Sequence, residues 1–315
     1  MSNDDLQVVL GGGGGMGSAV VRALADRGRR VRAVGRRPVA APAGVEVMAA
    51  DVSSLEGAKR ACAGASVVYH CANAPYHRWP QELLPLTRAI LEGAAAAQAK
   101  LVVGDNLYLY GPQSAPLTED TPPAAKTRKG RVRALAAVEM LDAHSRGRVR
   151  VTIGRASDFY GPGGLSSAAG EWMFRDVLAG KAASWVGSLD QPHTLNYLED
   201  LGRALVTLGE RGEADGQVWH LPAAEPITGR EFLTRVFESL GRPPKMAVVS
   251  RPMILMAGVF VPFIRETWEM LYQWERPFIM DDAKFRHAFG PFAATPHKEA
   301  VARTVRWFEE RAKRR

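Results

Sequence analysis

The sequence has only two cysteines in 315 residues, Cys62 and Cys71, and it has no internal repeat. Two such closely spaced cysteines do not form a disulfide framework, and no metal-type spacing joins them to histidines, so we expect a reducing compartment and no metal site. The longest apolar run, residues 253–264, is well short of the roughly twenty residues that span a bilayer. We therefore expect no membrane span and interpret this run as a buried helix or pocket lid, with membrane-surface contact as the alternative.

Targeting and nucleic-acid signals are also lacking. The first residues, Met1-Ser2-Asn3-Asp4-Asp5, are acidic and no hydrophobic signal region follows, so we expect a cytoplasmic protein. The net charge of +8 favours anions such as a phosphorylated cofactor, whereas no basic and aromatic motif indicates nucleic acid. With 46% hydrophobic residues, the chain can bury a full core in one large or two intimate domains.

Glycine is concentrated near the start of the chain. An apolar run, residues 6–10, is followed by residues 11–17, which are all glycine except Met16, and by an amphipathic segment over residues 18–27. This order of strand, turn and helix predicts a dinucleotide-binding turn, with the helix N-terminus facing a diphosphate. Two registers fit, Gly11-x-x-Gly14-x-x-Gly17 and Gly12-x-Gly14-x-x-Gly17, and a flexible linker is the alternative. The predicted cofactor contacts in this turn are Gly11, Gly14, Gly15, Met16 and Gly17.

The residues after the second predicted strand, 31–34, indicate the type of cofactor. No carboxylate is present there to bind the ribose hydroxyls of NAD. Arg36 and Arg37 can instead donate paired hydrogen bonds to a 2′-phosphate. We therefore favour NADP, while NAD stays open if these arginines are a solvated pair. Asp51 and Val52 follow the strand 45–49, where the carboxylate can accept a hydrogen bond from the adenine amino group. Small residues follow the strand 67–70 and leave room for the cofactor, and Ala72 and Asn73 are candidates there.

Strands and helices alternate through the first half of the chain. Helices are predicted over residues 81–99 and 130–146, and strands over 101–103 and 149–153. This rhythm predicts a Rossmann-type, doubly wound parallel α/β sheet with ligands beyond the carboxyl ends of its strands. We assign residues 1–163 to this dinucleotide-binding domain, completed by residues 191–222 with a helix over 198–210 and a strand over 217–221. Residues 164–190 and 223–315 form a smaller, mixed substrate-binding region.

The order of motifs resembles an extended or atypical short-chain dehydrogenase/reductase of the NAD-dependent epimerase/dehydratase type. The glycine motif and Asp51-Val52 match, although Leu10 replaces the usual Thr or Ser. Residues 105–111 resemble the family's Ser-Ser-x-x-Val-Tyr-Gly stretch, and residues 155–163 resemble Arg-Pro-x-Asn-Val-Tyr-Gly-Pro-Gly. Residues 193–200 lie where the family often has Arg-Asp-Phe-x-Tyr-Val-x-Asp. The resemblance implies an NAD(P)-dependent oxidoreductase, and it allows a homodimer paired through the helices 81–99 and 130–146.

The catalytic positions depart from this family. Its usual proton donor is the Tyr of a Tyr-x-x-x-Lys motif, assisted by a Ser or Thr. The matching positions here are Lys129, Arg133 and Asn106, so the cofactor site is kept while the triad is changed. Lys129 and Arg133 are four residues apart on a helix and share a face. By the resemblance, Arg133 binds the nicotinamide ribose.

Acid catalysis therefore needs another group. An ammonium that is partly desolvated beside another cation loses its proton more readily, so Lys129 is a candidate acid or a stabiliser of an oxyanion. The alternative is that Lys129 and Arg133 belong to a basic, solvated helix start. Asn106 fits polarisation of a carbonyl, and Tyr108 is a candidate source of the missing phenol.

The substrate is expected to be a small organic molecule, apolar or aromatic. His193 replaces an Arg that often contacts a substrate phosphate in the family, which weakens the case for a nucleotide sugar. The candidate substrate residues are Asp158, Tyr160, Trp185 and His193. We expect an NADPH-dependent reductase, with a sugar-type epimerase or dehydratase and a non-catalytic NADP sensor as alternatives.

Overall fold

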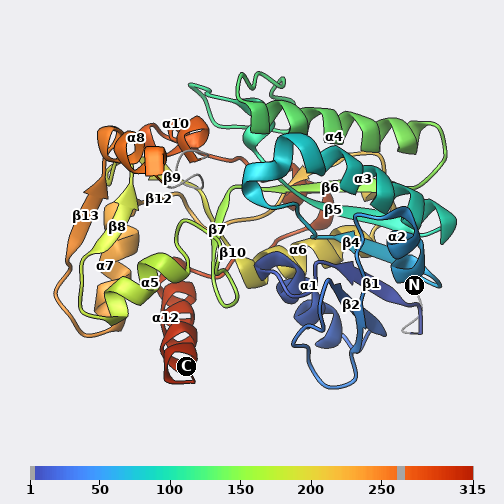
Figure 1. Ribbon diagram of the computed structural model, residues 1–315, viewed down its shortest axis with the longest axis horizontal. Helices are drawn as coiled ribbons and strands as arrows, with labels where there is room; N and C mark the ends of the chain where they lie inside the picture. Colours follow the sequence, from blue (N-terminus) through green and yellow to red (C-terminus); the bar gives the residue numbers. More distant parts are fainter. Residues whose placement is uncertain (1–3, 261–266, 315) are drawn as a thin grey trace.

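The computed structural model describes residues 4–260 and 267–314 and contains a seven-stranded parallel sheet with the order β11-β6-β5-β4-β1-β2-β3 (Figure 1). Every strand pair in this sheet is parallel. The direction of winding reverses at β1, and this confirms the predicted doubly wound α/β fold. The strands are β1 (Gln7–Leu10), β2 (Val31–Gly35), β3 (Glu46–Ala49), β4 (Val67–His70), β5 (Lys100–Asn106), β6 (Val151–Ala156) and β11 (Val218–His220).

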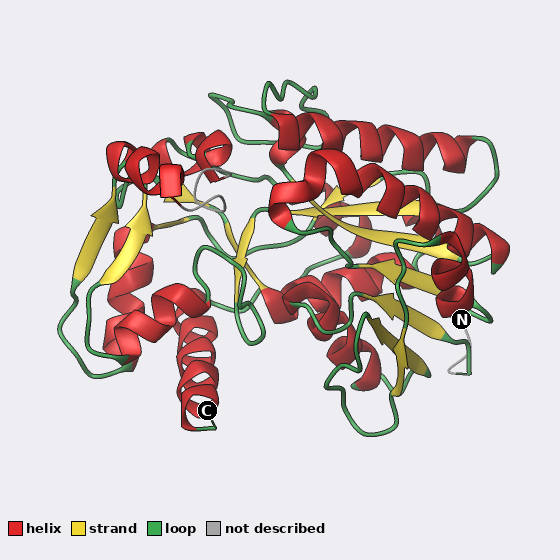
Figure 2. Cartoon of the chain, viewed as in Figure 1, coloured by secondary structure: helices red, strands yellow, loops and turns green. Residues whose placement is uncertain are grey.

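Helices cover both faces of the sheet (Figure 2). One face packs against α1 (Gly15–Ala25) and α6 (Leu198–Glu210), which lie side by side. The other face packs against α2 (Leu55–Cys62), α3 (Trp79–Ala96) and α4 (Arg128–Ser145). The central strands β1, β4 and β5 are almost completely buried, as expected for strands that are covered on both faces.

A second region packs around its own aromatic core, on the left in Figure 1. Three two-stranded sheets contribute to it: β7 (Asp158–Tyr160) with β10 (Leu195–Tyr197), β8 (Ala183–Val186) with β13 (Met246–Val249), and β9 (Pro192–His193) with β12 (Ile227–Thr228). Its helices are α5 (Glu171–Leu178), α7 (Gly229–Ser239), α8 (Arg251–Phe260), α10 (Tyr272–Glu275) and α12 (His297–Lys313), whereas α11 (Ala283–Phe289) packs against β11 of the large sheet. Single 3-10 turns are η1 (Tyr76–Arg78), η2 (Tyr108–Tyr110), η3 (Gly212–Ala214) and η4 (Trp268–Met270).

Several predicted boundaries differ from the structure. Helix α1 begins at Gly15 and not at Ser18, because the glycine turn itself forms its first turn. Helices α3 and α4 begin two residues earlier than predicted, and β5 and β6 extend three residues further.

The apolar run 253–264 was expected to be a buried helix or a pocket lid, and α8 does form a helix there, but the expected burial is wrong for most of its described side chains. Met253, Met256 and Val259 are 49%, 65% and 76% exposed, and Ile254 is buried. Residues 261–264 lie outside the described part of the chain. Within the described part, no helix is both long and apolar enough to cross a membrane.

Candidate functional site

The glycine turn between β1 and α1 resolves the register that the sequence left open. Gly11 has φ +82°, and a Cβ there would lie 2.7 Å from the backbone of Ala72. A Cβ on Gly17 would lie 2.1 Å from the carbonyl oxygen of Gly11, so only glycine fits at both positions. At Gly14 the nearest atom to such a Cβ is 3.4 Å away, so the backbone there faces open space. The structure therefore selects Gly11-x-x-Gly14-x-x-Gly17.

The start of α1 is open to an anion. Gly14 is its N-cap and supplies no side-chain hydrogen bond, and the first turn carries no acidic side chain. Gly13 and Gly14 are exposed, while Gly15 and Met16 are partly buried in the first turn. The first N–H groups of a helix have no intrahelical partner and can bind an anion, so the contact of this turn with a diphosphate stays a prediction.

The adenosine side of the predicted cofactor site follows β2 and β3. Arg36 and Arg37 are exposed and form no hydrogen bond or ion pair with another described residue. Oδ1 of Asp51 accepts two hydrogen bonds from Ser53, one from its backbone N–H at 3.0 Å and one from its hydroxyl at 2.6 Å. These hydrogen bonds, and to a smaller extent Arg36, lower the pKa of Asp51. Val52 is buried beside it.

Arg133 is anchored in a buried polar network. Its Nη1 donates to Oδ1 of Asp105 at 3.2 Å, its Nη2 donates to Oδ1 of Asn73 at 2.9 Å, and its guanidinium stacks 4.1 Å from the ring centre of Trp79. Asn73 is exposed, and Ala72 beside it is partly buried. Arg133 thus lies at the carboxyl ends of β4 and β5, where the sequence placed it, but its hydrogen bonds run to the protein.

The network continues from Asp105 away from Arg133. Nε of Arg155 donates to Oδ2 of Asp105 at 3.3 Å, and its Nη1 donates to the hydroxyl of Tyr110 at 2.7 Å. That hydroxyl donates to Nε2 of His220 at 2.9 Å, because Nδ1 of His220 donates to the carbonyl of Asp281. Burial lowers the pKa of His220 to about 4, so it is neutral at pH 7.

Lys129 is fully buried, and its ammonium lies 4.6 Å from the ring centre of Tyr76. The alternative of a solvated basic helix start is therefore wrong for Lys129 and for Arg133, which is 7% exposed. Oδ1 of Asn106 accepts from the backbone N–H of Tyr108 at 3.1 Å. Burial, Tyr76 and Asp158 raise the pKa of Tyr108, so its phenol stays protonated at neutral pH.

Asp158 and His193 form a close pair, and Asp158 lies within electrostatic range of Tyr108. Nε2 of His193 lies 3.0 Å from Oδ2 of Asp158, and its Nδ1 lies 3.1 Å from the carbonyl oxygen of Gln273. The imidazole stacks on Trp274 with ring centres 4.3 Å apart. The structure thus joins two predicted substrate residues that are 35 positions apart in the sequence.

The other two predicted substrate residues lie in the core of the second region. Tyr160 is fully buried and its hydroxyl is bonded to Nδ1 of His297 at 2.8 Å. Trp185 is 4% exposed and packs on Phe232 and Trp274. Their contacts are with core residues, so the prediction that Tyr160 and Trp185 touch the substrate has no support in the structure.

Sequence reasoning missed several residues of the site. Tyr76 and Tyr272 are partly exposed aromatic residues, Trp79 is buried against Arg133, and Asp105 and Arg155 hold the network together. Asp105 and Arg155 both stand in motifs that carried the family resemblance, and an acidic and a basic residue at the ends of adjacent parallel strands are the signal for such a pair. Among residues 4–260 and 267–314, no three metal-ligating side chains gather in one place.

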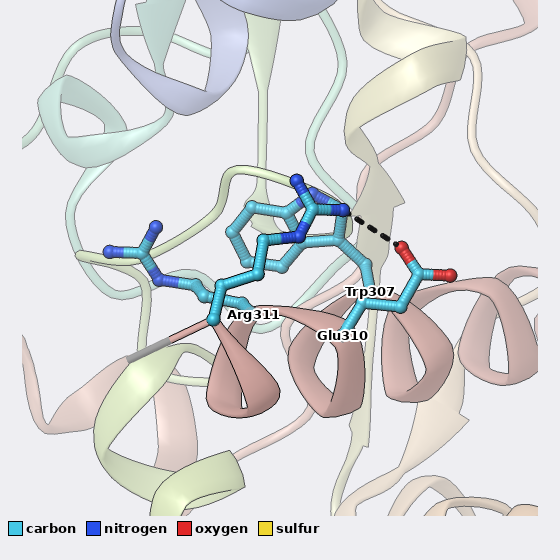
Figure 3. Close-up of a pocket in the computed structure, with 4 residues that line it drawn as sticks. Trp307, Glu310 and Arg311 are labelled. Atoms are coloured by element: carbon cyan, nitrogen blue, oxygen red, sulfur yellow. Dashed lines mark hydrogen bonds and ion pairs between the residues drawn. The ribbon is translucent and has the colours of Figure 1, made fainter.

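A hollow on α12 is a separate feature. It is lined by Trp307, Glu310, Arg311 and Arg314 (Figure 3). Nη2 of Arg314 lies 3.5 Å from Glu310, and the Arg311 guanidinium lies over the Trp307 ring. These residues come from one helix of the second region and include neither the glycine turn nor the strand ends, so the hollow is not part of the candidate site.

Two curated proteins resemble this chain along most of its length. A 3-diazoavenalumate denitrifying reductase from a Streptomyces species is 29% identical over 255 residues, which cover 75% of this chain and 82% of that protein. A 3 beta-hydroxysteroid dehydrogenase/Delta 5-->4-isomerase from Mycobacterium tuberculosis is 26% identical over 294 residues, which cover 84% of this chain and 75% of that protein.

Solved structures share the fold. MoeE5 in complex with UDP-glucose and NAD has a TM-score of 0.78 and 22% identity, covering 98% of this chain and 99% of that one. DesIV, a dTDP-glucose 4,6-dehydratase from Streptomyces venezuelae with NAD and TYD bound, has a TM-score of 0.79 and 19% identity, covering 98% of both chains. A sequence profile matches residues 7–221, more than half of the chain. The chain therefore belongs to the NAD-dependent epimerase/dehydratase family.

Proposed function

We propose that the protein is an NADPH-dependent reductase of a small organic molecule with an aromatic or other apolar, unsaturated group. The observation that carries this proposal is the rebuilt reaction centre. Lys129 and Arg133 occupy the helix positions at which the resemblance places Tyr and Lys, and both are buried against aromatic rings. A centre of this kind is suited to a polarised double bond or imine, for which a strong phenolic acid is less essential than for a plain ketone.

The residues at the glycine turn fit a phosphorylated dinucleotide. The close approach of Gly11 and Gly17 and the open backbone at Gly14 make a cradle that any Cβ at the first two positions would fill. Arg36 and Arg37 would hold a 2′-phosphate, since they lie exposed after β2 and Arg36 is within electrostatic range of Asp51. When bound, the nicotinamide supplies or accepts the hydride.

Aromatic side chains support the choice of substrate. The rings of Tyr76 and Trp79 lie 5.0 Å apart, and Trp79 and Tyr108 lie 5.8 Å apart, measured between ring centres. Tyr272 lies close enough to Tyr108 and Asp158 for both to raise its pKa, although burial is the main cause. The name of the Streptomyces relative describes it as a reductase, which also favours this direction of reaction.

Each polar residue has a distinct part in the proposed reaction. Asn106 polarises the acceptor through its amide N–H₂, because its oxygen is used by the backbone of Tyr108. The buried ammonium of Lys129 stabilises negative charge that develops on the substrate. Arg133, fixed by Asp105 and Asn73, positions the nicotinamide end of the cofactor.

Stopped-flow oxidation of NADPH tests the proposal. Enones, quinones and imines with aromatic substituents are mixed with the protein, and the absorbance of NADPH is followed in single turnovers. We expect hydride transfer to at least one class and a loss of about 10²-fold in the Lys129→Ala variant. Lys126→Ala, a variant of an exposed lysine just before the same helix, is the matched control and should react like the wild type. The absence of turnover with every class would refute the reductase.

Two other functions remain as second candidates. A sugar-type epimerase or dehydratase is favoured by the likeness of the whole fold to MoeE5 and DesIV, and it predicts tightly retained, oxidised cofactor after purification. A non-catalytic NADP sensor is favoured by the replaced triad, and it predicts cofactor binding without turnover and no loss of function in Lys129→Ala.

A further inference from the structure

The two buried histidines near the carboxyl ends of the strands are bonded in different ways. In both, Nδ1 faces a backbone carbonyl, which can only accept a hydrogen bond, so Nδ1 carries a proton. Nε2 of His220 faces the Tyr110 hydroxyl, which can donate, so His220 needs no second proton. Nε2 of His193 faces the carboxylate of Asp158 at 3.0 Å, and two acceptors at that distance require a hydrogen between them.

The Asp158–His193 pair therefore holds one proton more than a free carboxylate and a neutral imidazole would hold. The proton lies either on Nε2 of His193 or on Oδ2 of Asp158. The titratable side chains around the pair are the phenols of Tyr108 and Tyr272, and burial raises the pKa of both. Those phenols are poor acids, so they do not compete with the pair as a proton source.

Exposure decides which end of the pair can reach a substrate. The side chain of His193 is 3% exposed and is enclosed by Trp274 and Phe278, whereas that of Asp158 is 20% exposed. Asp158 follows β6 and lies within electrostatic range of Tyr108, which follows β5. The carboxyl group is thus the accessible end of the pair, and it lies near Tyr108, a candidate residue of the reaction centre.

We propose that Asp158 is the proton donor of this site and that His193 is the positioning residue that keeps it supplied with a proton. This inference rests on the proposed reductase function. Hydride adds to one atom of the acceptor's double bond, the π electrons move to the other atom, and that atom takes the proton from Asp158. Asp158 is left as a carboxylate and His193 as a neutral imidazole with its Nδ1–H still bonded to Gln273, and the two acceptors then repel each other until a proton returns between them. Water at the exposed edge of Asp158 returns the proton.

The proton itself can be observed without turnover. Protein labelled with ¹⁵N-histidine and ¹³C-aspartate is studied by NMR, which reports whether each ring nitrogen and each carboxyl group carries a proton. We expect either a protonated Nε2 on His193 or a protonated carboxyl on Asp158. His220 is the internal control and should show an unprotonated Nε2. In Asp158→Asn, the amide can donate to Nε2, so the extra proton should vanish while the pair stays hydrogen-bonded. An unprotonated Nε2 together with an ionised Asp158 in the wild type would overturn the inference.

Kinetics provide the second readout. Asp158→Asn should lower the single-turnover rate with the best acceptor by about 10²-fold or more and leave the Kd for NADPH unchanged. His193→Gln should lower the rate and change its pH profile, a change that a purely structural role would not produce. Asp190→Asn, at an exposed aspartate paired with Arg230, is the matched control. Wild-type turnover in Asp158→Asn would overturn the inference and leave the reductase standing. No turnover in the wild type would instead refute the reductase, and with it any proton donation by Asp158.

Discussion

Asp105 is the residue on which the buried network depends, and its replacement makes a quantitative prediction. The Asp105 side chain is 2% exposed, and the side chains of Arg133 and Arg155 are 9% and 5% exposed. Asp105 forms ion pairs with Arg133 at 3.2 Å and with Arg155 at 3.3 Å. At an effective dielectric constant of about 20, each pair of unit charges about 4 Å apart is attracted by about 4 kcal/mol. Repulsion between the two guanidiniums and the cost of desolvation offset part of this gain. Removing one partner of a buried ion pair typically costs 3–5 kcal/mol, roughly, because the remaining charge is left uncompensated.

We therefore expect Asp105→Asn to lower the free energy of unfolding by about 4 kcal/mol, a large share of the 5–15 kcal/mol, roughly, of a typical domain. Urea unfolding followed by both tryptophan fluorescence and far-UV circular dichroism measures the change. The control is Asp142→Asn, whose carboxylate pairs with Arg146 on the surface at 3.0 Å and should contribute less than about 1 kcal/mol. A loss of under about 1 kcal/mol in Asp105→Asn would refute the reasoning.

Three further predictions concern the cofactor site and pH. Gly17→Ala should prevent cofactor binding, since its Cβ would lie 2.1 Å from the Gly11 carbonyl oxygen. Gly14→Ala should fold normally. Calorimetry with NADPH measures cofactor binding by each variant, and thermal unfolding measures its stability. Combined replacement of Arg36 and Arg37 by Ala should weaken NADPH binding at least tenfold and leave NADH binding unchanged, and equal losses for both cofactors would contradict a 2′-phosphate site. Burial lowers the pKa of His220 to about 4, so below about pH 6.5 the unfolded chain binds more protons than the folded one. The free energy of unfolding should therefore fall as the pH drops from about 6.5 toward 4. In urea titrations, His220→Gln should make this dependence of the unfolding free energy on pH less steep.

Local patterns were sufficient for the cofactor-binding half of the fold. The apolar runs of β1 and β4 and the glycine turn between β1 and α1 are signals that lie within a few residues of one another. The register of the five glycines was not predictable, because the requirement at Gly17 comes from the carbonyl of Gly11 and that at Gly11 comes from Ala72, more than fifty positions away.

The candidate site was predicted less completely, since its contacts join distant parts of the chain. Lys129 and Arg133 were found through the resemblance, but their burial depends on Tyr76 and Trp79 from the segment that leads into α3. Trp185 was expected near the substrate because large aromatic residues serve cores and binding sites equally well, and only the fold shows that Phe232 and Trp274 enclose it.

The uncapped beginning of α1 ties the robustness of the fold to its ligand. The first turn has neither a side-chain cap nor an acidic residue, and in the proposed function a bound diphosphate would supply the hydrogen-bond acceptors for its amides. A ligand that binds only the native state at a hundred times its Kd adds about 2.7 kcal/mol to the unfolding free energy. The melting temperature of the protein should accordingly track the dinucleotide pool around it, and a cell depleted of dinucleotide would hold a less durable protein.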